Sequence, residues 1–219
     1  MKLKKNKYLK ITCDGGAATG KSTGAKLIAK KLNISFLSSG LLYRYASYLI
    51  LKYNPKKEVN FLRKSFKSLN YNKLNKINLH TPEISYQSAI IAKKLKVRNI
   101  LKNYQKEFIK IHKSCVLEGR DASTKILPNS DVKFFFKCNI NIAAKRRFME
   151  LKKKHSNIKL NAVKKALKLR NISDKNRKHS PLKMHKNAVV VDTGKLNKQA
   201  MVAKMTKHIE RVIKEKYGN

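Results

Sequence analysis

Short strand-like segments, either apolar or alternately apolar and polar, recur along the chain, and segments with the apolar spacing of a helix follow them. The strand-like segments are Tyr8–Cys13, Ile34–Leu37, Cys115–Leu117, Val132–Phe136 and Ala188–Val191. The helix-like segments are Lys21–Leu32, Leu41–Leu51, Val97–His112, Ile140–Lys153, Asn161–Asp174 and Leu196–Lys216. Strands that alternate with helices form parallel sheets flanked by helices, so this order predicts an α/β fold with a five-stranded parallel sheet.

Three segments interrupt the alternation. Residues 52–82 form a polar stretch rich in Asn and Lys, which we interpret as a small insert folded over a site. Residues 154–159 and 175–186 are basic, and Pro181 lies within the second of them. Such segments suit the hinges of a mobile lid. Because parallel sheets bind ligands at the carboxyl ends of their strands, we expect the functional motifs at those ends.

The first strand and the first helix are joined by Gly15–Ser22, which reads Gly-Gly-Ala-Ala-Thr-Gly-Lys-Ser and fits the pattern G-x-x-x-x-G-K-[S/T]. Glycines let the backbone N–H groups of such a loop surround a triphosphate, and the following helix adds its positive N-terminal end. Lys21 can reach the β- and γ-phosphates, and Ser22 can bind Mg²⁺. The preceding strand and the following amphipathic helix favour this reading over a helix that merely begins with glycines.

Positive charge is spread along the whole sequence. The 219 residues include 53 Lys and Arg against 12 Asp and Glu, which gives a formal net charge of +41. Such a charge attracts nucleic acids through their phosphates. The lysines, however, are distributed over the sequence and accompanied by many Asn and Ile residues, as AT-rich codons would produce. We therefore favour a general lysine bias over selected nucleic-acid binding, and we expect no specific nucleic-acid partner.

Length and cysteine content indicate the class of protein. A chain of 219 residues suits one compact domain with a sizeable core. Its three cysteines, Cys13, Cys115 and Cys138, have no C-x-x-C spacing. We expect them to be small apolar core residues without disulfides, in a protein of a reducing compartment. No apolar stretch of signal-peptide or membrane-span length follows the basic N-terminus. We expect a soluble cytoplasmic protein with no membrane partner.

Acidic residues are rare, yet four of the twelve lie in segments that also carry arginines or the phosphate loop: Asp14, Glu118, Asp121 and Asp174. Arg44 follows the second strand, Arg120 follows the third, and Arg170, Asp174 and Arg177 share one face of a predicted helix. Each segment alone fits a helix cap, a local salt bridge or a solvated ion-pair face. Together they favour phosphoryl transfer between nucleotides, because several arginines are needed to neutralise the phosphates of donor and acceptor.

With these motifs the chain resembles the bacterial-type cytidylate kinases, the CMP/dCMP kinase branch of the nucleoside monophosphate kinases. The similarity covers nearly the whole chain in order and spacing, apart from a shorter insert between Arg44 and Arg98. Two departures are Ser38 and Ala18, where the family usually has Asp and Gly. The matching residues are Asp14, the phosphate loop, Ser39–Arg44, Pro82–Ile84, Val97–Arg98, Gln105, Gly119–Thr124, Lys133–Phe136, Arg146–Arg147, Arg170, Asp174, Arg177, Ser180–Leu182 and Asp192–Thr193.

The resemblance implies a P-loop NTPase-like fold of three layers, α/β/α, in a single kinase domain that spans residues 1–219. Residues 6–51 and 98–219 would form the core. An insert at about 52–97 would bind the nucleoside monophosphate, and a mobile lid would lie at about 154–180. The family likeness also favours a monomer.

The resemblance further implies a role for each matching residue. ATP would be bound by Gly15, Gly16, Ala17, Ala18, Thr19, Gly20, Lys21, Ser22, Thr23 and Arg147. The acceptor nucleotide would be bound by Ser39, Arg44, Arg98, Arg120, Asp121, Arg170, Asp174 and Arg177. Catalysis would rest on Lys21, Arg120, Arg170 and Arg177. The cofactor would be Mg²⁺, held by Ser22 directly and by Asp14 through water.

The implied reaction is the in-line transfer of a phosphoryl group from ATP to CMP or dCMP, which yields CDP or dCDP. Arg98 and Asp121 would read the cytosine edge, since an acid and an arginine match its amino donor and ring acceptor. A P-loop kinase with another small acceptor would keep the loop but lack Arg98 and the Arg120 and Arg170 motifs. A P-loop protein acting on nucleic acid would need a contiguous positive groove with interleaved aromatic residues.

Overall fold

A computed structural model describes residues 7–152 and 157–218 of the chain. The chain divides into two compact units, which are described separately. The first unit comprises Met1–Leu37 and Lys113–Asn219, and the second comprises Ser38–His112. The insert expected at 52–97 lies inside the second unit. Residues 154–156 of the expected lid lie outside the described residues.

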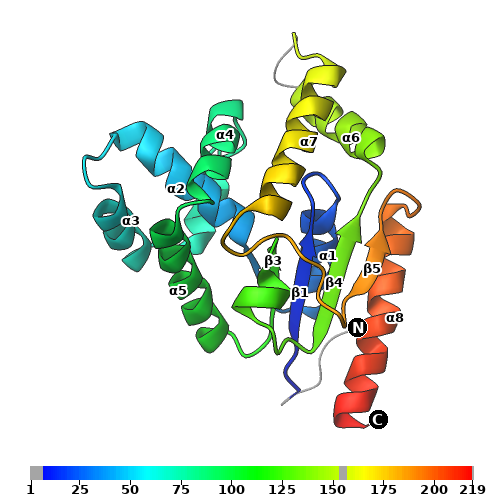
Figure 1. The fold of residues 1–219 in the computed structure, drawn as a ribbon. Helices are drawn as coiled ribbons and strands as arrows, with labels where there is room; N and C mark the ends of the chain where they lie inside the picture. Colours follow the sequence, from blue (N-terminus) through cyan, green and yellow to red (C-terminus); the bar gives the residue numbers. More distant parts are fainter. Residues whose placement is uncertain (1–6, 153–156, 219) are drawn as a thin grey trace. The chain divides into compact units, whose positions relative to one another are not determined.

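A five-stranded sheet forms the centre of the first unit, as predicted (Figure 1). Strand β1 pairs in parallel with β3 and β4, and β4 pairs in parallel with β5. The order across the sheet is β2-β3-β1-β4-β5. Because the strands run in the same direction, the functional segments that follow them emerge at one edge. The strands are β1 (Lys10–Gly15), β2 (Ser35–Ser38), β3 (Cys115–Gly119), β4 (Val132–Lys137) and β5 (Val189–Asp192).

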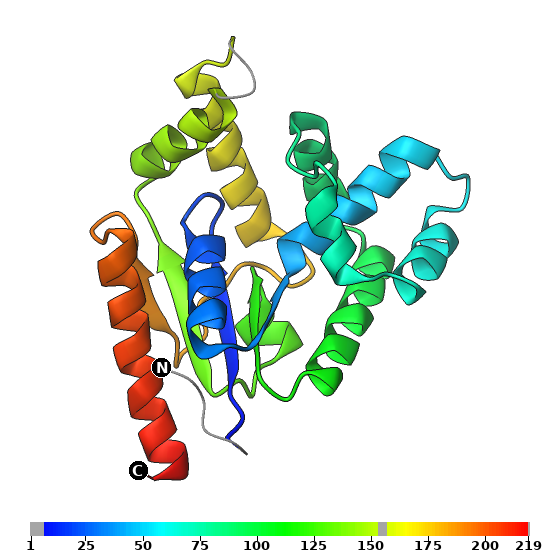
Figure 2. The same cartoon turned by 180° about the vertical axis from the view of Figure 1, so that it is seen from behind.

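Two helices of the first unit cover one face of this sheet, and two others lie beyond its carboxyl edge (Figures 1 and 2). Helices α1 and α8 pack on each other, and their apolar faces bury Phe134 and Phe136 of the sheet. Helices α6 and α7 pack on each other near the loop that follows β1. The helices are α1 (Lys21–Leu32), α6 (Ile140–Lys152), α7 (Leu160–Asn176) and α8 (Lys198–Tyr217).

Helix α1 carries a glycine on its inner face, and the ring of Phe136 from β4 packs against it. A Cβ atom on Gly24 would lie 2.8 Å from the ring of Phe136, a side chain that is 1% exposed. Real Cβ atoms do not approach that closely, so the glycine leaves room for the Phe136 ring beneath the helix. The N-terminus of α1, and the loop before it, are positioned by this contact.

We expect the substitution Gly24→Ala to lower the free energy of unfolding by about 1–3 kcal/mol, because the buried Phe136 ring must shift. In an open helix position the same change would stabilise by roughly 1 kcal/mol. The control is Gly40→Ala in the second unit, where a Cβ would meet Ser38 Oγ at an ordinary 3.6 Å. Urea unfolding of both variants measures the difference. A Gly24→Ala protein as stable as Gly40→Ala would contradict the packing argument.

The second unit is helical. Its elements are α2 (Ser39–Tyr53), α3 (Glu58–Lys67), the 3₁₀ helix η1 (Tyr71–Lys76), α4 (Pro82–Ile91) and α5 (Leu95–Ile111). Helix α3 lies in the polar stretch for which the sequence predicted only an insert. Its apolar face consists of Leu62 and Phe66, one turn apart, and the Phe66 ring packs edge-on against Tyr104 of α5. Two buried side chains are thus enough to anchor a helix that is otherwise polar.

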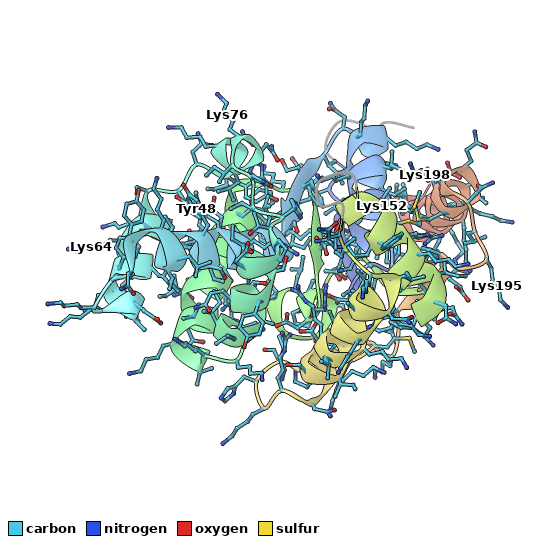
Figure 3. All side chains as sticks on the ribbon, turned by 90° about the horizontal axis from the view of Figure 1, so that it is seen from above. Tyr48, Lys64, Lys76, Lys152, Lys195 and Lys198 are labelled. Carbon is cyan, nitrogen blue, oxygen red and sulfur yellow. The ribbon has the colours of Figure 1, made fainter. Side chains whose placement is uncertain are left out.

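Charged side chains surround both units. Lys64 and Lys76 of the second unit and Lys195 and Lys198 of the first extend outward from the ribbon (Figure 3). Among the described residues, every helix is too short or too polar to cross a membrane. The three cysteines, all of them in described segments, are free thiols.

Candidate active site

The loop between β1 and α1 takes a backbone course that glycine makes accessible. Gly15 has a φ of 154°, and a Cβ there would lie 2.5 Å from the carbonyl oxygen of Phe136. Gly20, with a φ of 76°, caps the N-terminus of α1 in the left-handed conformation. Ala18 also adopts a positive φ, 56°, where the side chain makes the conformation unfavourable. The loop thus wraps around the N-terminus of α1 as a phosphate cradle requires.

Lys21, the lysine of this loop, is buried and held by two oxygen atoms. Its Nζ donates to the Gly16 carbonyl at 3.1 Å and pairs with Glu118 Oε1 at 3.3 Å. Burial lowers the pKa of Lys21 to about 8; the nearby Arg120 acts in the same direction, and Glu118 opposes it. The ammonium group therefore lies inside the loop, where burial makes its charged form unfavourable. An anion that binds in the loop would stabilise that charge.

Two of the residues predicted to bind a metal have different surroundings. Ser22 and Thr23 are exposed in the first turn of α1. Asp14 is fully buried and accepts three hydrogen bonds, from the backbone N–H groups of Ala122 and Ser123 at 2.8 and 2.7 Å and from the Ser123 hydroxyl at 2.6 Å. Burial raises the pKa of Asp14 to about 6, although these hydrogen bonds oppose the shift. The carboxylate of Asp14 thus anchors the segment that follows Asp121.

That segment is η2 (Ala122–Ile126), a single π-helical turn, and it fixes a cluster of ion pairs. Arg120 Nε donates to Asp174 Oδ2 at 2.8 Å. Arg177 reaches two carboxylates, Asp174 Oδ1 at 3.5 Å and Asp121 Oδ1 at 3.6 Å. Burial opposes the ionisation of Asp174, but Arg120 and Arg170 outweigh it and hold the pKa of that carboxyl below its usual value. The Arg120–Asp174 pair joins residues that are 54 positions apart in the sequence.

Arg170 lies in the same cluster, where Asp174 compensates only part of its charge. Its buried Nε has no hydrogen-bond acceptor within the described part of the chain. Burial lowers the pKa of Arg170 to about 10. The positive charges of Arg120, Arg147 and Arg177 lower it further, and the negative charge of Asp174 opposes them. A half-buried guanidinium with an unused, buried Nε donor and three like charges around it suits the binding of an anion such as phosphate.

In the second unit, two predicted substrate residues make well-defined contacts. Ser39 Oγ donates to Gln105 Oε1 at 2.5 Å, and both side chains are buried. Arg44 Nη1 donates to the Leu79 carbonyl at 3.0 Å and to Ser85 Oγ at 2.7 Å. These bonds hold the polar end of Arg44 against the segment around the start of α4.

Arg98, the third predicted substrate residue of this unit, is 6% exposed. Its Nη1 donates to the Ala92 carbonyl at 3.1 Å, and its guanidinium carbon lies 5.6 Å from the centre of the Tyr43 ring. The arginine is therefore oriented by the turn between α4 and α5 and by an aromatic face.

The sequence did not predict roles for two side chains that contact the loop after β1. Asn171 Oδ1 accepts a hydrogen bond from the Ala17 backbone N–H at 2.9 Å. Thr193 Oγ1 donates to the Thr19 carbonyl at 2.8 Å, and Arg146 Nη1 donates to the same hydroxyl at 3.1 Å. Asn171 could have been found from its place beside Arg170, and Thr193 from its place at the end of the fifth strand.

Comparison with known proteins identifies close relatives. The model of the cytidylate kinase family matches residues 11–211. The cytidylate kinase of Bartonella tribocorum is 35% identical over 209 residues, which cover 93% of this chain and 95% of that protein. The cytidylate kinase of Thermosipho melanesiensis is 35% identical over 217 residues, 94% of this chain and 97% of that protein.

Solved structures share the fold at low sequence identity. A shikimate kinase from Bacteroides thetaiotaomicron has a TM-score of 0.52 and 13% identity, over 92% of this chain and 98% of that protein. A Thermus thermophilus protein has a TM-score of 0.52 and 15% identity, over 93% and 97% of the two chains. The fold is that of the P-loop NTPases, as predicted.

Proposed function

Since the chain belongs to the cytidylate kinase family and phosphorylates CMP and dCMP with ATP, we propose that its loop after β1 binds ATP and that its arginines bind the acceptor. The observation that carries this assignment is Arg170. Its buried Nε lacks an acceptor among the described residues, and the charge of Arg120 crowds it. The phosphate of a nucleoside monophosphate supplies both the acceptor and the negative charge.

On the donor side, the backbone of the loop from Gly15 to Thr23 binds the phosphates of ATP, and Arg147 contributes positive charge. Lys21 leaves the Gly16 carbonyl and Glu118 to meet the β- and γ-phosphates. This move is favourable because the phosphates stabilise the ammonium form that burial disfavours. In the ligand-free chain Glu118 keeps the lysine at the mouth of the loop.

A divalent metal accompanies ATP in this reaction, and we propose Mg²⁺. The Ser22 hydroxyl is an exposed hard oxygen donor in the first turn of α1, which suits this ion, and Asp14 acts through water. Within the described ranges, groups of three or more His, Cys, Asp or Glu that could cage a metal do not occur. The site at Ser22 therefore fits an ion that takes most of its ligands from phosphates and water. When bound, Mg²⁺ neutralises charge on the β- and γ-phosphates.

On the acceptor side, three groups of residues have distinct roles. Arg44, Arg120 and Arg170 bind the acceptor phosphate. Arg98 and Asp121 bind the cytosine edge, and Asp174, Arg177 and Ser39 bind the sugar hydroxyls. The Arg177–Asp121 and Arg120–Asp174 ion pairs support these assignments, because they hold both carboxylates in a defined orientation.

The phosphoryl group moves in line from ATP to the acceptor. A phosphate oxygen of CMP forms a bond to the γ-phosphorus while the bond to the β,γ-bridging oxygen breaks, and ADP leaves. The attacking oxygen is already anionic, so no general base is required. Lys21, Arg120, Arg170 and Arg177 stabilise the equatorial oxygens of the transferring group. Their burial strengthens this stabilisation, since charges interact more strongly away from water.

We propose further that the chain is one monomeric kinase domain, with residues 52–97 as the nucleotide-binding insert and residues 154–180 as the lid. The lid assignment is supported by α7, which carries Arg170 and Asp174 and is followed directly by Arg177. A cytoplasmic location is supported by the free thiols of the three cysteines.

Activity should depend on pH through Lys21. Its pKa of about 8 means that the ammonium form is lost above pH 8 in the ligand-free enzyme. We expect kcat/KM for ATP to fall about fivefold between pH 8 and pH 9, since kcat/KM reports the free enzyme. The kcat profile should bend at higher pH, because bound phosphates favour the charged amine. The variant Lys21→Arg should be less active, but its side chain stays protonated, so its kcat/KM for ATP should not fall between pH 8 and pH 9. A flat kcat/KM profile up to pH 9.5 would contradict this prediction.

The proposed function is tested by measuring ADP formation from ATP and Mg²⁺ with CMP, dCMP, UMP, AMP or no acceptor. We expect rapid turnover with CMP and dCMP and little with UMP, whose carbonyl would face the carboxylate of Asp121. Equal ADP formation without an acceptor would mean that the loop binds ATP but the acceptor site is wrongly assigned.

A further inference from the structure

The phosphate loop is attached to helix α7 by one polar side chain. Asn171 Oδ1 accepts the hydrogen bond of the Ala17 backbone N–H at 2.9 Å. The approach is close, since a Cβ on Gly16 would lie 3.1 Å from the same oxygen. Ala17 is 7% exposed, so its N–H would otherwise be buried without an acceptor.

An apolar contact lies beside this hydrogen bond. Ala17 packs in a cluster with Ala143 and Ala144 of α6 and Val163 and Leu167 of α7. Leu167 and Asn171 are four residues apart, so they lie on the same face of α7. The loop therefore contacts α7 in two ways. The Ala17 methyl group packs on the apolar cluster, and the Asn171 side-chain amide fixes the position of the loop along the helix.

The same helix carries the arginine with the unused donor. Arg170 precedes Asn171, and Asp174, which follows one turn later, pairs with Arg120. The Ala17–Asn171 hydrogen bond thus joins the loop that binds the phosphate donor to the helix that binds the phosphate acceptor. Phosphoryl transfer depends steeply on the alignment of these two groups.

We propose that Asn171 is a positioning residue, which acts through the Ala17 N–H to hold the ATP loop in register with Arg170. This inference rests on the proposed roles of the loop and of Arg170. The requirement is for an acceptor oxygen at the Asn171 position. A carboxylate would supply the same oxygen, and its negative charge would be tolerated next to Arg170, whose surroundings are mainly positive.

The test compares three substitutions in the full-length enzyme. Asn171→Ala removes the acceptor, Asn171→Asp keeps an acceptor oxygen, and Ile172→Ala changes an exposed neighbour on the same helix. Steady-state kinetics give kcat, KM for ATP and KM for CMP separately. Exchange of the Ala17 amide hydrogen, followed by NMR, reports the hydrogen bond itself without reference to turnover.

We expect Asn171→Ala to lower kcat/KM for ATP at least tenfold, to change KM for CMP less than threefold, and to accelerate exchange of the Ala17 amide. Asn171→Asp and Ile172→Ala should remain within threefold of the wild type in both measurements. The proposal is overturned if Asn171→Ala has wild-type kinetics with fast exchange, or if Asn171→Asp is as impaired as Asn171→Ala. Wild-type turnover with CMP in the same assay tests the proposed function independently.

Discussion

Replacing Arg170 by alanine is expected to lower kcat/KM for CMP by a factor on the order of 10³, without any loss of folding stability. The catalytic loss follows from the removal of a guanidinium that binds the acceptor phosphate and stabilises the transferring group. Stability should be maintained or increased, because the pKa of Arg170, lowered to about 10, indicates that its buried charge is unfavourable in the ligand-free protein.

Steady-state kinetics measure the expected loss of kcat/KM, and urea unfolding measures the expected absence of a loss in stability. Arg170→Lys is the matched variant, since it keeps the charge but loses the planar pair of donors, and its activity should lie between those of alanine and wild type. An Arg170→Ala enzyme with near-normal activity would remove Arg170 from the acceptor site. A large loss of stability would mean instead that the guanidinium holds the fold.

Replacing Asp174 by alanine is expected to lower the free energy of unfolding by about 3–5 kcal/mol, because buried cations are left without their partner. Arg120 loses a hydrogen bond of 2.8 Å, and Arg177 loses a contact of 3.5 Å. KM for CMP should also rise, since Asp174 is proposed to bind the sugar hydroxyls. The control is Glu107→Ala, which breaks the exposed Lys110–Glu107 pair and should cost less than about 1 kcal/mol.

The stability difference between wild type and Asp174→Ala should depend on pH in a defined direction. The pKa of Asp174 is lower in the folded protein than the ordinary value of 3.8 for this carboxyl group. The contribution of this ionised group is therefore complete above pH 4 and is lost as the pH falls through the folded pKa. Unfolding curves between pH 7 and pH 3 should converge at the acid end. A difference that persists unchanged at pH 3 would assign the loss to packing.

The sequence predicted α1 with the correct ends, Lys21 and Leu32, because the phosphate-loop pattern fixes where the helix starts and its apolar spacing fixes where it ends. All five strands were also predicted. Helix α3 was not, because only Leu62 and Phe66 mark its buried face in a stretch of Lys and Asn. Its stability comes from α5, which lies far along the chain, so local pattern does not reveal it.

In the candidate site, too, some features could be predicted from the sequence and others could not. Their spacing predicted Arg170, Asp174 and Arg177 on one helix face. The structure places Arg170 and Asp174 in α7, but the helix ends at Asn176 and Arg177 follows it with an extended backbone. The contact of Asn171 with Ala17 spans 154 positions, and the anchoring of η2 by Asp14 spans more than 100. The low pKa of Lys21 likewise arises from burial and from Arg120. Such properties depend on which segments meet in the folded chain, and spacing along the sequence contains no record of them.

The unused Nε donor of Arg170 would link the lifetime of this protein to its supply of nucleotides. An anion that binds the folded chain and not the unfolded one adds RT ln(1 + [L]/Kd) to stability, about 2.7 kcal/mol at a hundredfold excess over Kd. Proteases act on the transiently unfolded population. Cells depleted of cytidine nucleotides would therefore degrade the protein faster than well-supplied cells, and its abundance would follow the concentration of its own substrate.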